Sequence, residues 1–239
     1  MTFVPVEQVV MDACTHAHSD APRESCGVVV VRGGKQKYYP CRNMIEGTEH
    51  FMMHPEDLAC VEDLGVVIAY VHSHPSTGLN PSEADLQGIE STNLPWMIVS
   101  PSTGMYTVTE PTGYKPPLYG RQFAHGVFDC YSFVRDAYVQ LFKLEIPNYS
   151  RDFEWWTSGQ DLISQNFESA GFTEVPCNQL QVGDGVLMSF GAQVINHVGL
   201  LVEDNMLGHH MTGRLSSMDV YSGLYRGRTI KIVRHKDLA

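Results

Sequence analysis

The first half of the chain contains short apolar runs separated by amphipathic segments. The apolar runs predict strands, with a Gly33-Gly34 turn after the first of them, over residues 26–32, 37–41, 66–74, 96–100 and 105–109. Helices are predicted over residues 6–18, 55–64 and 82–92. Strands with intervening helices indicate an α/β fold.

The second half of the chain has a different order, with helices before strands. A helix is predicted over residues 129–142, because one of its faces gathers the apolar side chains of Phe133, Val134, Ala137, Tyr138 and Leu141. A second helix is predicted over residues 159–170, where Gly171 suits the C-terminal cap. Strands are then predicted over residues 185–189, 194–202, 206–211 and 230–234. This order indicates an α+β fold.

A proline-rich segment separates the two halves. Three prolines and one glycine fall within residues 110–117, a composition that continues neither a helix nor a central strand. We therefore predict one domain over residues 1–110, a linker over residues 111–117 and a second domain over residues 118–239. Both domains have a size that is ordinary for independent folding.

The composition is that of packed domains, and the charge is acidic. Of the 239 residues, 43% are hydrophobic and 18% are charged, which excludes a disordered chain. The net charge is −11; residues 1–110 hold five Lys or Arg against fourteen Asp or Glu, and residues 118–239 hold ten against thirteen. This balance argues against nucleic-acid binding, which needs clustered cations. The basic tail is expected to be a solvated strand edge: Arg226, Arg228, Lys231, Arg234 and Lys236.

No targeting feature is visible in the sequence. No apolar run approaches the roughly 20 residues that span a bilayer, and the N-terminus lacks the basic and apolar regions of a secretory signal. Six cysteines are scattered along the chain without a CxxC pair. We therefore expect reduced thiols and a cytosolic chain.

A metal-binding pattern follows the predicted strand at residues 66–74. His72 and His74 are two residues apart, so both point to the same side of that strand. Pro75 ends the strand, and Ser82 begins a helix whose first turn contains Asp85. Three nitrogen and oxygen ligands with one open position are typical of a catalytic zinc site, where bound water becomes acidic and a carbonyl is polarised.

The general base of such a site would be Glu24, which lies just before a strand, although a surface carboxylate is the plainer interpretation. Together, Glu24, His72, His74, Ser82 and Asp85 resemble the motif of the JAMM/MPN zinc isopeptidases, over roughly residues 1–110. The resemblance implies a cytidine-deaminase-like α/β fold and zinc bound by the two histidines and Asp85. It also implies that Glu24 is the general base and that Ser82 stabilises the oxyanion. A zinc deaminase is excluded, because the P-C-x-x-C motif that supplies its cysteine ligands is absent.

A second candidate site contains a thiol. Cys130 follows Asp129 at the start of the predicted helix, where a thiol is expected to ionise near neutral pH. His197 lies on a predicted strand and is a candidate proton acceptor. His209 is an even number of residues away, so a regular hairpin places both imidazoles on one face. His210 is expected to face the other way unless a bulge intervenes. Taken singly, each residue is more often part of a core.

The sequence around these residues resembles the NlpC/P60 cysteine peptidases, over about residues 117–239. The resemblance rests on residues 129–134, Gly183-Asp184 and residues 197–200. It implies a papain-like fold, a Cys130–His197–His209 triad that cleaves the peptide stems of peptidoglycan, and a substrate-side Tyr119. One departure is Tyr131-Ser132, where the family commonly has Ser-Gly; the tyrosine would narrow the substrate cleft.

The two domains in this order resemble the tail assembly protein K family of lambda-like tailed phages. The resemblance implies two hydrolase sites that act in tail-tip assembly or entry: a thiol peptidase for the wall and a zinc enzyme for an amide or isopeptide bond. It implies tail-tip proteins as partners, and the host cytoplasm and the virion tail tip as locations. Two alternatives remain open: an assembly factor whose activity is incidental, and a bacterial peptidase that acts on recycled wall peptides.

Overall fold

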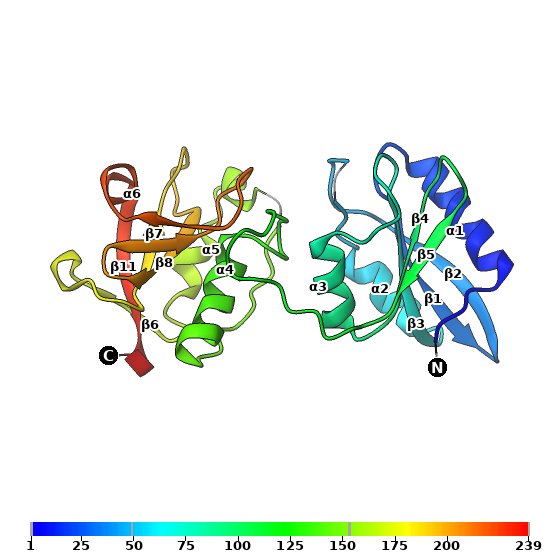
Figure 1. Ribbon diagram of the computed structural model, residues 1–239, viewed down its shortest axis with the longest axis horizontal. Coiled ribbons are helices and arrows are strands. Elements are labelled where there is room, and N and C mark those ends of the chain that lie inside the picture. The colour runs from blue at the N-terminus through cyan, green and yellow to red at the C-terminus, as the bar shows by residue number, and fades with distance from the viewer. Residues whose placement is uncertain (1, 49, 153, 239) are drawn as a thin grey trace. The chain divides into compact units, whose positions relative to one another are not determined.

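The computed structural model describes residues 2–48, 50–152 and 154–238. The chain forms two compact units, Met1–Lys115 and Pro116–Ala239 (Figure 1). The break lies inside the proline-rich segment, and the bounds that we predicted for the linker stay a prediction. The start of that segment is bound to the first unit, since the backbone amides of Thr112, Gly113 and Tyr114 all donate to a carboxylate oxygen of Glu90, at 2.7 to 2.9 Å.

The first unit is built on a five-stranded sheet with the order β2-β1-β3-β4-β5. Strands β3 and β4 run parallel, and the other neighbours are antiparallel. In chain order its elements are α1 (Glu7–Asp20), β1 (Cys26–Arg32), β2 (Lys35–Cys41), α2 (Pro55–Glu62), β3 (Val66–Ser73), α3 (Glu83–Thr92), β4 (Trp96–Val99) and β5 (Tyr106–Thr109).

Helices cover both faces of this sheet. The apolar side of α1 packs on one face, where Ala13 and Ala17 meet Val29 and Val71. The opposite face meets α2, because successive side chains of a strand point to opposite sides and Val28 and Val30 therefore face the other way. Helix α3 lies on this second face too, against Trp96. Val71 faces α1, so the next residue, His72, points to the opposite face of the sheet, where α2 and α3 lie.

The second unit is built on a six-stranded sheet with the order β10-β9-β8-β7-β11-β6. All neighbouring strands in it are antiparallel. Its elements are α4 (Cys130–Ala137), the π-helical turn η1 (Tyr138–Phe142), η2 (Trp155–Ser158), α5 (Leu162–Asn166), β6 (Phe172–Val175), η3 (Cys177–Gln179), β7 (Gly185–Met188), β8 (His197–Glu203), β9 (Met206–His209), β10 (Ser217–Val220), α6 (Gly223–Arg228), β11 (Thr229–His235) and η4 (Lys236–Leu238).

The second sheet also has an apolar core on each face. Helix α4 and the residues that follow it pack on one side, where Phe133 and Tyr138 are fully buried against Leu200 and Leu187. On the other side Tyr225 of α6 packs on the sheet. Among the described residues, no helix has the length and apolar character that crossing a membrane requires.

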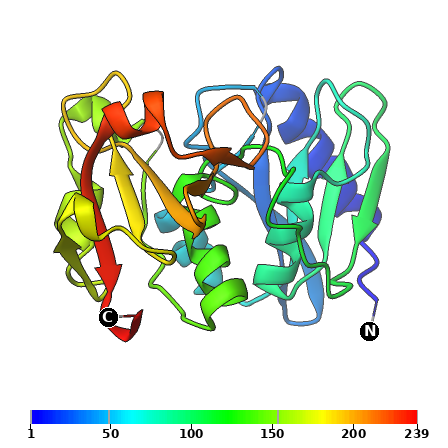
Figure 2. The ribbon, with the colours of Figure 1, turned by 60° about the vertical axis from the view of Figure 1, so that its left-hand side comes forward.

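The predicted fold class is confirmed for both halves, and three details differ. The helix predicted over residues 159–170 is only Leu162–Asn166, because Asp161 caps its start and Gly159 has φ +79°. Strands β6 and β10 and helix α6 were not predicted. The basic tail is not a strand edge: β11 lies inside the sheet between β7 and β6, as the red strand beside the yellow strand β7 shows in Figure 2.

Candidate functional sites

The carboxyl end of β3 carries two of the three predicted metal ligands. His72 lies within β3, and His74 follows its last residue. Asp85 approaches from α3, and the three side chains are buried. The two Nε2 atoms are 3.1 Å apart, His72 Nε2 lies 3.1 Å from Asp85 Oδ1, and His74 Nε2 lies 3.3 Å from Asp85 Oδ2. The structure therefore brings together the three residues that the spacing indicated.

The start of α3 explains how Asp85 is placed. Ser82 is the N-cap residue: its hydroxyl accepts from the Asp85 amide at 3.1 Å, and Asp85 Oδ2 accepts from the Ser82 amide at 2.7 Å. This reciprocal capping box locks the first turn. The Ser82 hydroxyl still has its own proton to donate. The local sequence thus fixes the carboxylate relative to the helix start, before any tertiary contact is made.

The donor atoms of His72, His74 and Asp85 fit a zinc ion. Atoms bound at about 2.0–2.1 Å by one tetrahedral zinc lie roughly 3.3 Å from one another. The two Nε2 atoms are 3.1 Å apart, and each lies 3.1 to 3.3 Å from one of the two Asp85 oxygens. His74 Nδ1 lies 2.7 Å from the Gly78 carbonyl, so it carries the proton and leaves the lone pair on Nε2. Although burial opposes its charge, Asp85 is an anion, because His72 and His74 hold its pKa well below the usual range.

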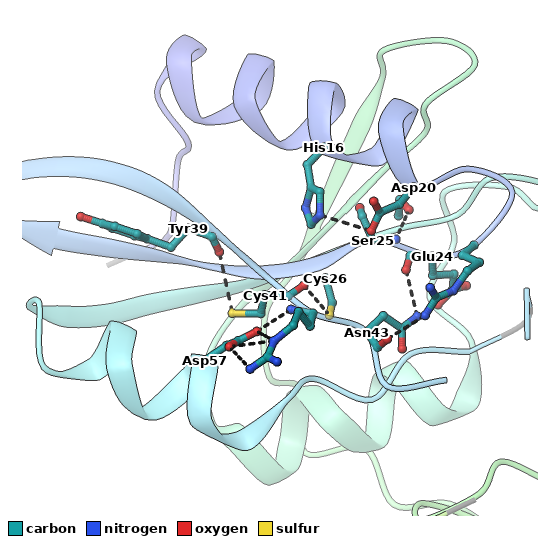
Figure 3. A network of polar contacts seen from close by, with 12 residues as sticks. His16, Asp20, Glu24, Ser25, Cys26, Tyr39, Cys41, Asn43 and Asp57 are labelled. Atoms are coloured by element: carbon teal, nitrogen blue, oxygen red, sulfur yellow. Dashed lines mark hydrogen bonds and ion pairs between the residues drawn. The ribbon is translucent and has the colours of Figure 1, made fainter. Parts of the chain in front are cut away.

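Glu24 lies beside the triad, just before β1. Its side chain is buried, which raises the pKa of the carboxyl, while His72 and His74 act in the opposite direction. Hydrogen bonds hold the backbone at Glu24 and at the next residue, Ser25. The Asn43 side chain donates to the Glu24 carbonyl at 2.9 Å (Figure 3). The Ser25 amide donates to the Ser73 hydroxyl at 2.8 Å. Glu24 is therefore a buried carboxylate close to the metal-binding group and not a surface residue.

Two aromatic residues that we did not predict surround His72. The ring of Phe51 stacks on the imidazole at 4.7 Å between centroids, and Trp96 of β4 meets it edge-on at 5.5 Å. They exclude water from one side of the triad. Phe51 lies in a loop without a periodic pattern, so no signal in the sequence identified it.

The thiol site begins at the N-terminus of α4. Asp129 is the N-cap residue, and its carboxylate accepts from the amides of Ser132 and Gly126, both at 2.9 Å. Arg151 completes its surroundings, with Nε 2.6 Å from Oδ2 and Nη2 2.8 Å from Oδ1. This buried ion pair fixes the residue that precedes Cys130. Arg151 was not among the predicted site residues.

His197 and His209 lie on neighbouring strands and face each other. His197 Nε2 is 3.0 Å from His209 Nδ1 across the β8–β9 hairpin. The hairpin is not the regular one that the even spacing assumed, because its pairing shifts register between Leu201 and Glu203. A further partner, which the sequence analysis missed, is Asp219 of β10, whose Oδ2 lies 3.1 Å from His209 Nε2. Tyr225 of α6 donates to the same Oδ2 atom at 2.5 Å.

The electrostatics of Cys130 differ from the expectation. Burial and the adjacent Asp129 carboxylate raise the pKa of the thiol to about 12, although the amides of Val198 and Tyr131 favour the thiolate. Burial also lowers the pKa of His197 to about 3. The expected ionisation near neutral pH is therefore wrong for the free site, because desolvation and Asp129 outweigh the helix N-terminus. The resting site holds a neutral thiol and a neutral imidazole.

Cys130 and His197 line one pocket that continues into the apolar core of the second unit. Its far walls are aromatic and aliphatic side chains that include Trp155, Trp156, Ile163 and Phe167. His210 also lines this pocket. Its expected opposite orientation held only for a hairpin without a bulge, and the β8–β9 pairing shifts register between Leu201 and Glu203.

Tyr119, which we predicted to be a substrate-side residue, packs beside helix α4. Its ring packs on Phe133 at 5.7 Å between centroids and is 38% exposed. Burial and the nearby Glu203 raise the pKa of its phenol. Glu203 is at the opposite end of β8 from His197, and Tyr119 is not one of the described residues that line the Cys130 pocket.

Comparisons with known proteins match a different family to each of the two units. Residues 6–111 match the prokaryotic homologs of the JAB domain, and residues 119–234 match the NlpC/P60 family. The chain is 41% identical over 237 residues to tail tip assembly protein K of Escherichia phage N15, covering 98% of this chain and 97% of the relative. It is 38% identical over 184 residues to the phage lambda protein of the same name, covering 77% and 89%.

Among solved structures, a JAB1/MPN domain protein from Archaeoglobus fulgidus is 19% identical, with a TM-score of 0.31. The match covers 46% of this chain and 91% of that protein. The two family matches, one in each half, identify the first unit as a JAB/MPN domain and the second as an NlpC/P60 domain.

Proposed function

The chain belongs to the tail tip assembly protein K family, and from this premise we propose that it carries two peptidase sites used in tail-tip assembly or entry. The observation that supports the proposal best is the intact chemistry of each unit. One holds a converging His–His–Asp group with a buried glutamate beside it, and the other holds a cysteine and a histidine in one pocket. Its partners would be tail-tip proteins, met in the host cytoplasm and carried to the tail tip.

In the thiol site, Cys130 would be the nucleophile and His197 the base. Because both are neutral at rest, His197 accepts the thiol proton as the sulfur attacks the substrate carbonyl carbon. The same proton then passes to the leaving amine, and the acyl group stays on Cys130. Water, deprotonated by His197, attacks the thioester and releases the acid. His209 holds the imidazole of His197 throughout.

The substrate that we propose for this site is the peptide stem of peptidoglycan. Support comes from the NlpC/P60 match and from the need of an entering tail tip to pass the cell wall. Tyr119 stays a prediction as a substrate-side residue; its ring packs on Phe133, and it is not one of the described residues that line the pocket.

In the first unit, His72, His74 and Asp85 would hold zinc, and the site would hydrolyse an amide or isopeptide bond. When bound, the ion supplies a Lewis acid and an acidic water. Glu24, a buried carboxylate beside the three ligands, would take a proton from the attacking water and pass it to the leaving amine. The Ser82 hydroxyl can donate to the oxyanion, since it already accepts from the Asp85 amide.

Digestion of purified peptidoglycan, with products identified by mass spectrometry, tests the proposal. We expect wild-type protein to cut stem peptides, and Cys130→Ala and His197→Ala each to lower the rate at least about 1,000-fold. Chelator-treated protein should retain this cleavage. Cleavage that survives Cys130→Ala contradicts the thiol mechanism. If folded, metal-loaded protein cuts nothing, the chain acts as an assembly factor that binds tail-tip partners.

A further inference from the structure

A series of hydrogen bonds links His197 to residues beyond the predicted Cys130–His197–His209 triad. It runs from His197 Nε2 to His209 Nδ1 at 3.0 Å, and from His209 Nε2 to Asp219 Oδ2 at 3.1 Å. Tyr225 donates to the same oxygen. The four residues come from β8, β9, β10 and α6, and His197 and His209 are buried.

The ionisation of Asp219 determines which ring nitrogen of His209, and then of His197, carries the proton. Although partial burial opposes its charge, Tyr225 and His209 lower the pKa of Asp219, so it is a carboxylate that only accepts hydrogen bonds. Burial lowers the pKa of His209, so its ring is neutral; the ring must then carry its one proton on Nε2, which makes Nδ1 an acceptor. His197 must in turn donate from Nε2, and its Nδ1 is left with the free lone pair.

We propose that Asp219 is a positioning residue that sets the tautomer of His197 through His209. The proposal rests on the role of His197 as the base of the thiol site. Only the Nδ1 lone pair can receive the thiol proton, because Nε2 is used in the bond to His209. Tyr225 holds the carboxylate in place, and its own proton keeps it a donor.

Loss of the carboxylate would permit the opposite arrangement. A neutral His209 that no longer donates to an acceptor at Nε2 can carry its proton on Nδ1 and donate to His197 Nε2. The proton of His197 would then lie on Nδ1, where a base needs a lone pair, and the reaction would be blocked. An asparagine at position 219 permits this state, because its amide nitrogen can donate to His209 Nε2, which a carboxylate cannot do.

Other charged and titratable groups surround this series of hydrogen bonds. Arg214, from the loop before β10, acts on both His209 and Asp219. His210 and Asp129 act on His197. None of them supplies a second acceptor to His209 Nε2 among the contacts of the described residues. Asp219 is therefore the group on which the tautomer depends.

The test compares wild-type protein with Asp219→Asn in two measurements. The ¹⁵N chemical shifts of labelled imidazoles report which ring nitrogen carries the proton. We expect the Nε2–H form for His197 and His209 in the wild type and its loss in the variant. The rate of Cys130 alkylation by iodoacetamide, followed against pH, should fall about 10- to 100-fold near neutral pH.

Control variants separate positioning from mere structural support. Asp219→Glu keeps an acceptor and should restore the tautomer and most of the alkylation rate. Met218→Asn, at an exposed position of the same strand, should leave both measurements unchanged. Thermal unfolding checks that each variant is folded, and Tyr225→Phe, which loosens the carboxylate without removing it, should give a smaller loss than Asp219→Asn.

Wild-type tautomers together with a wild-type alkylation profile in Asp219→Asn would overturn the proposal. The outcome is distinct from a failure of the proposed function. If His197 is not the base, His197→Ala leaves Cys130 alkylation unchanged, whatever Asp219 does to the imidazole shifts. If the tautomers change in Asp219→Asn but alkylation of Cys130 does not, positioning by Asp219 has no catalytic consequence and the proposal fails.

Discussion

At the scale of single residues, Asp129 shows how one carboxylate serves two purposes. It caps α4 through the Ser132 amide, and it forms a buried ion pair with Arg151. Burial opposes its ionisation, but Arg151 and the backbone amides hold the pKa of Asp129 at about 2, below the ordinary 3.8. The charge that raises the pKa of the neighbouring Cys130 thiol is thus a structural requirement of the helix start.

This ion pair predicts a loss of stability in acid. Because the pKa is lower in the folded state, Asp129 contributes about 2 kcal/mol above roughly pH 4, and the contribution disappears as pH falls through about 2. Urea unfolding of wild type and Asp129→Asn across this range measures it. The difference in unfolding free energy between them should shrink by about this amount toward low pH. A constant difference would contradict the assignment.

At the scale of elements, the metal-binding group depends on how closely α3 approaches the sheet. Gly88 of α3 lies against Trp96, and a Cβ atom on it would come within 2.3 Å of the indole ring. The same indole meets His72 edge-on. Helix α3 also carries Asp85, so the small residue sets the distance between the carboxylate and the two histidines.

Substituting this glycine should therefore weaken metal binding without touching a ligand. We expect Gly88→Ala to cost about 1–3 kcal/mol of unfolding free energy, since the helix must shift away from Trp96. Calorimetric titration with Zn²⁺ should show a weaker affinity. The matched control is Gly227→Ala in α6, where a Cβ meets nothing within 4 Å, and it should be neutral or stabilising. Unchanged zinc affinity in Gly88→Ala would refute the close-approach argument.

At the scale of the whole molecule, two units carry separate chemistry. The ligand group lies within Met1–Lys115, and the cysteine pocket lies within Pro116–Ala239. No residue is shared between the two groups. Loss of the metal should therefore leave the thiol site unaffected.

A single metal-ligand variant tests this separation. Purified His74→Ala should contain no stoichiometric zinc by elemental analysis, because two ligands do not hold the ion, whereas Glu24→Gln should retain it. Cys130 in both variants should react with iodoacetamide at the wild-type rate. Zinc bound stoichiometrically to His74→Ala would contradict the ligand assignment, and altered thiol reactivity would show that the sites are coupled.

Much of the fold could be predicted because its signals are local. The strand at β1 has the predicted bounds, and Ser82 caps α3 where the Ser-x-x-Asp pattern indicated. The helix at residues 159–170 was predicted too long, since the capping contact of Asp161 acts within one turn and has little periodic signature. Strand β10 was missed, because four residues at a sheet edge alternate too briefly to be recognised.

The sequence by itself determined the two-domain division, the family of each half, and the residues that converge near β3, because these follow from motifs and from spacing along continuous strands and helices. Only the tertiary structure decided the rest. It added Arg151, Asp219 and Tyr225 to the surroundings of the thiol site, and gave Cys130 a raised pKa. The physical reason is that burial and long-range charge depend on which distant segments pack together, and no local pattern encodes that.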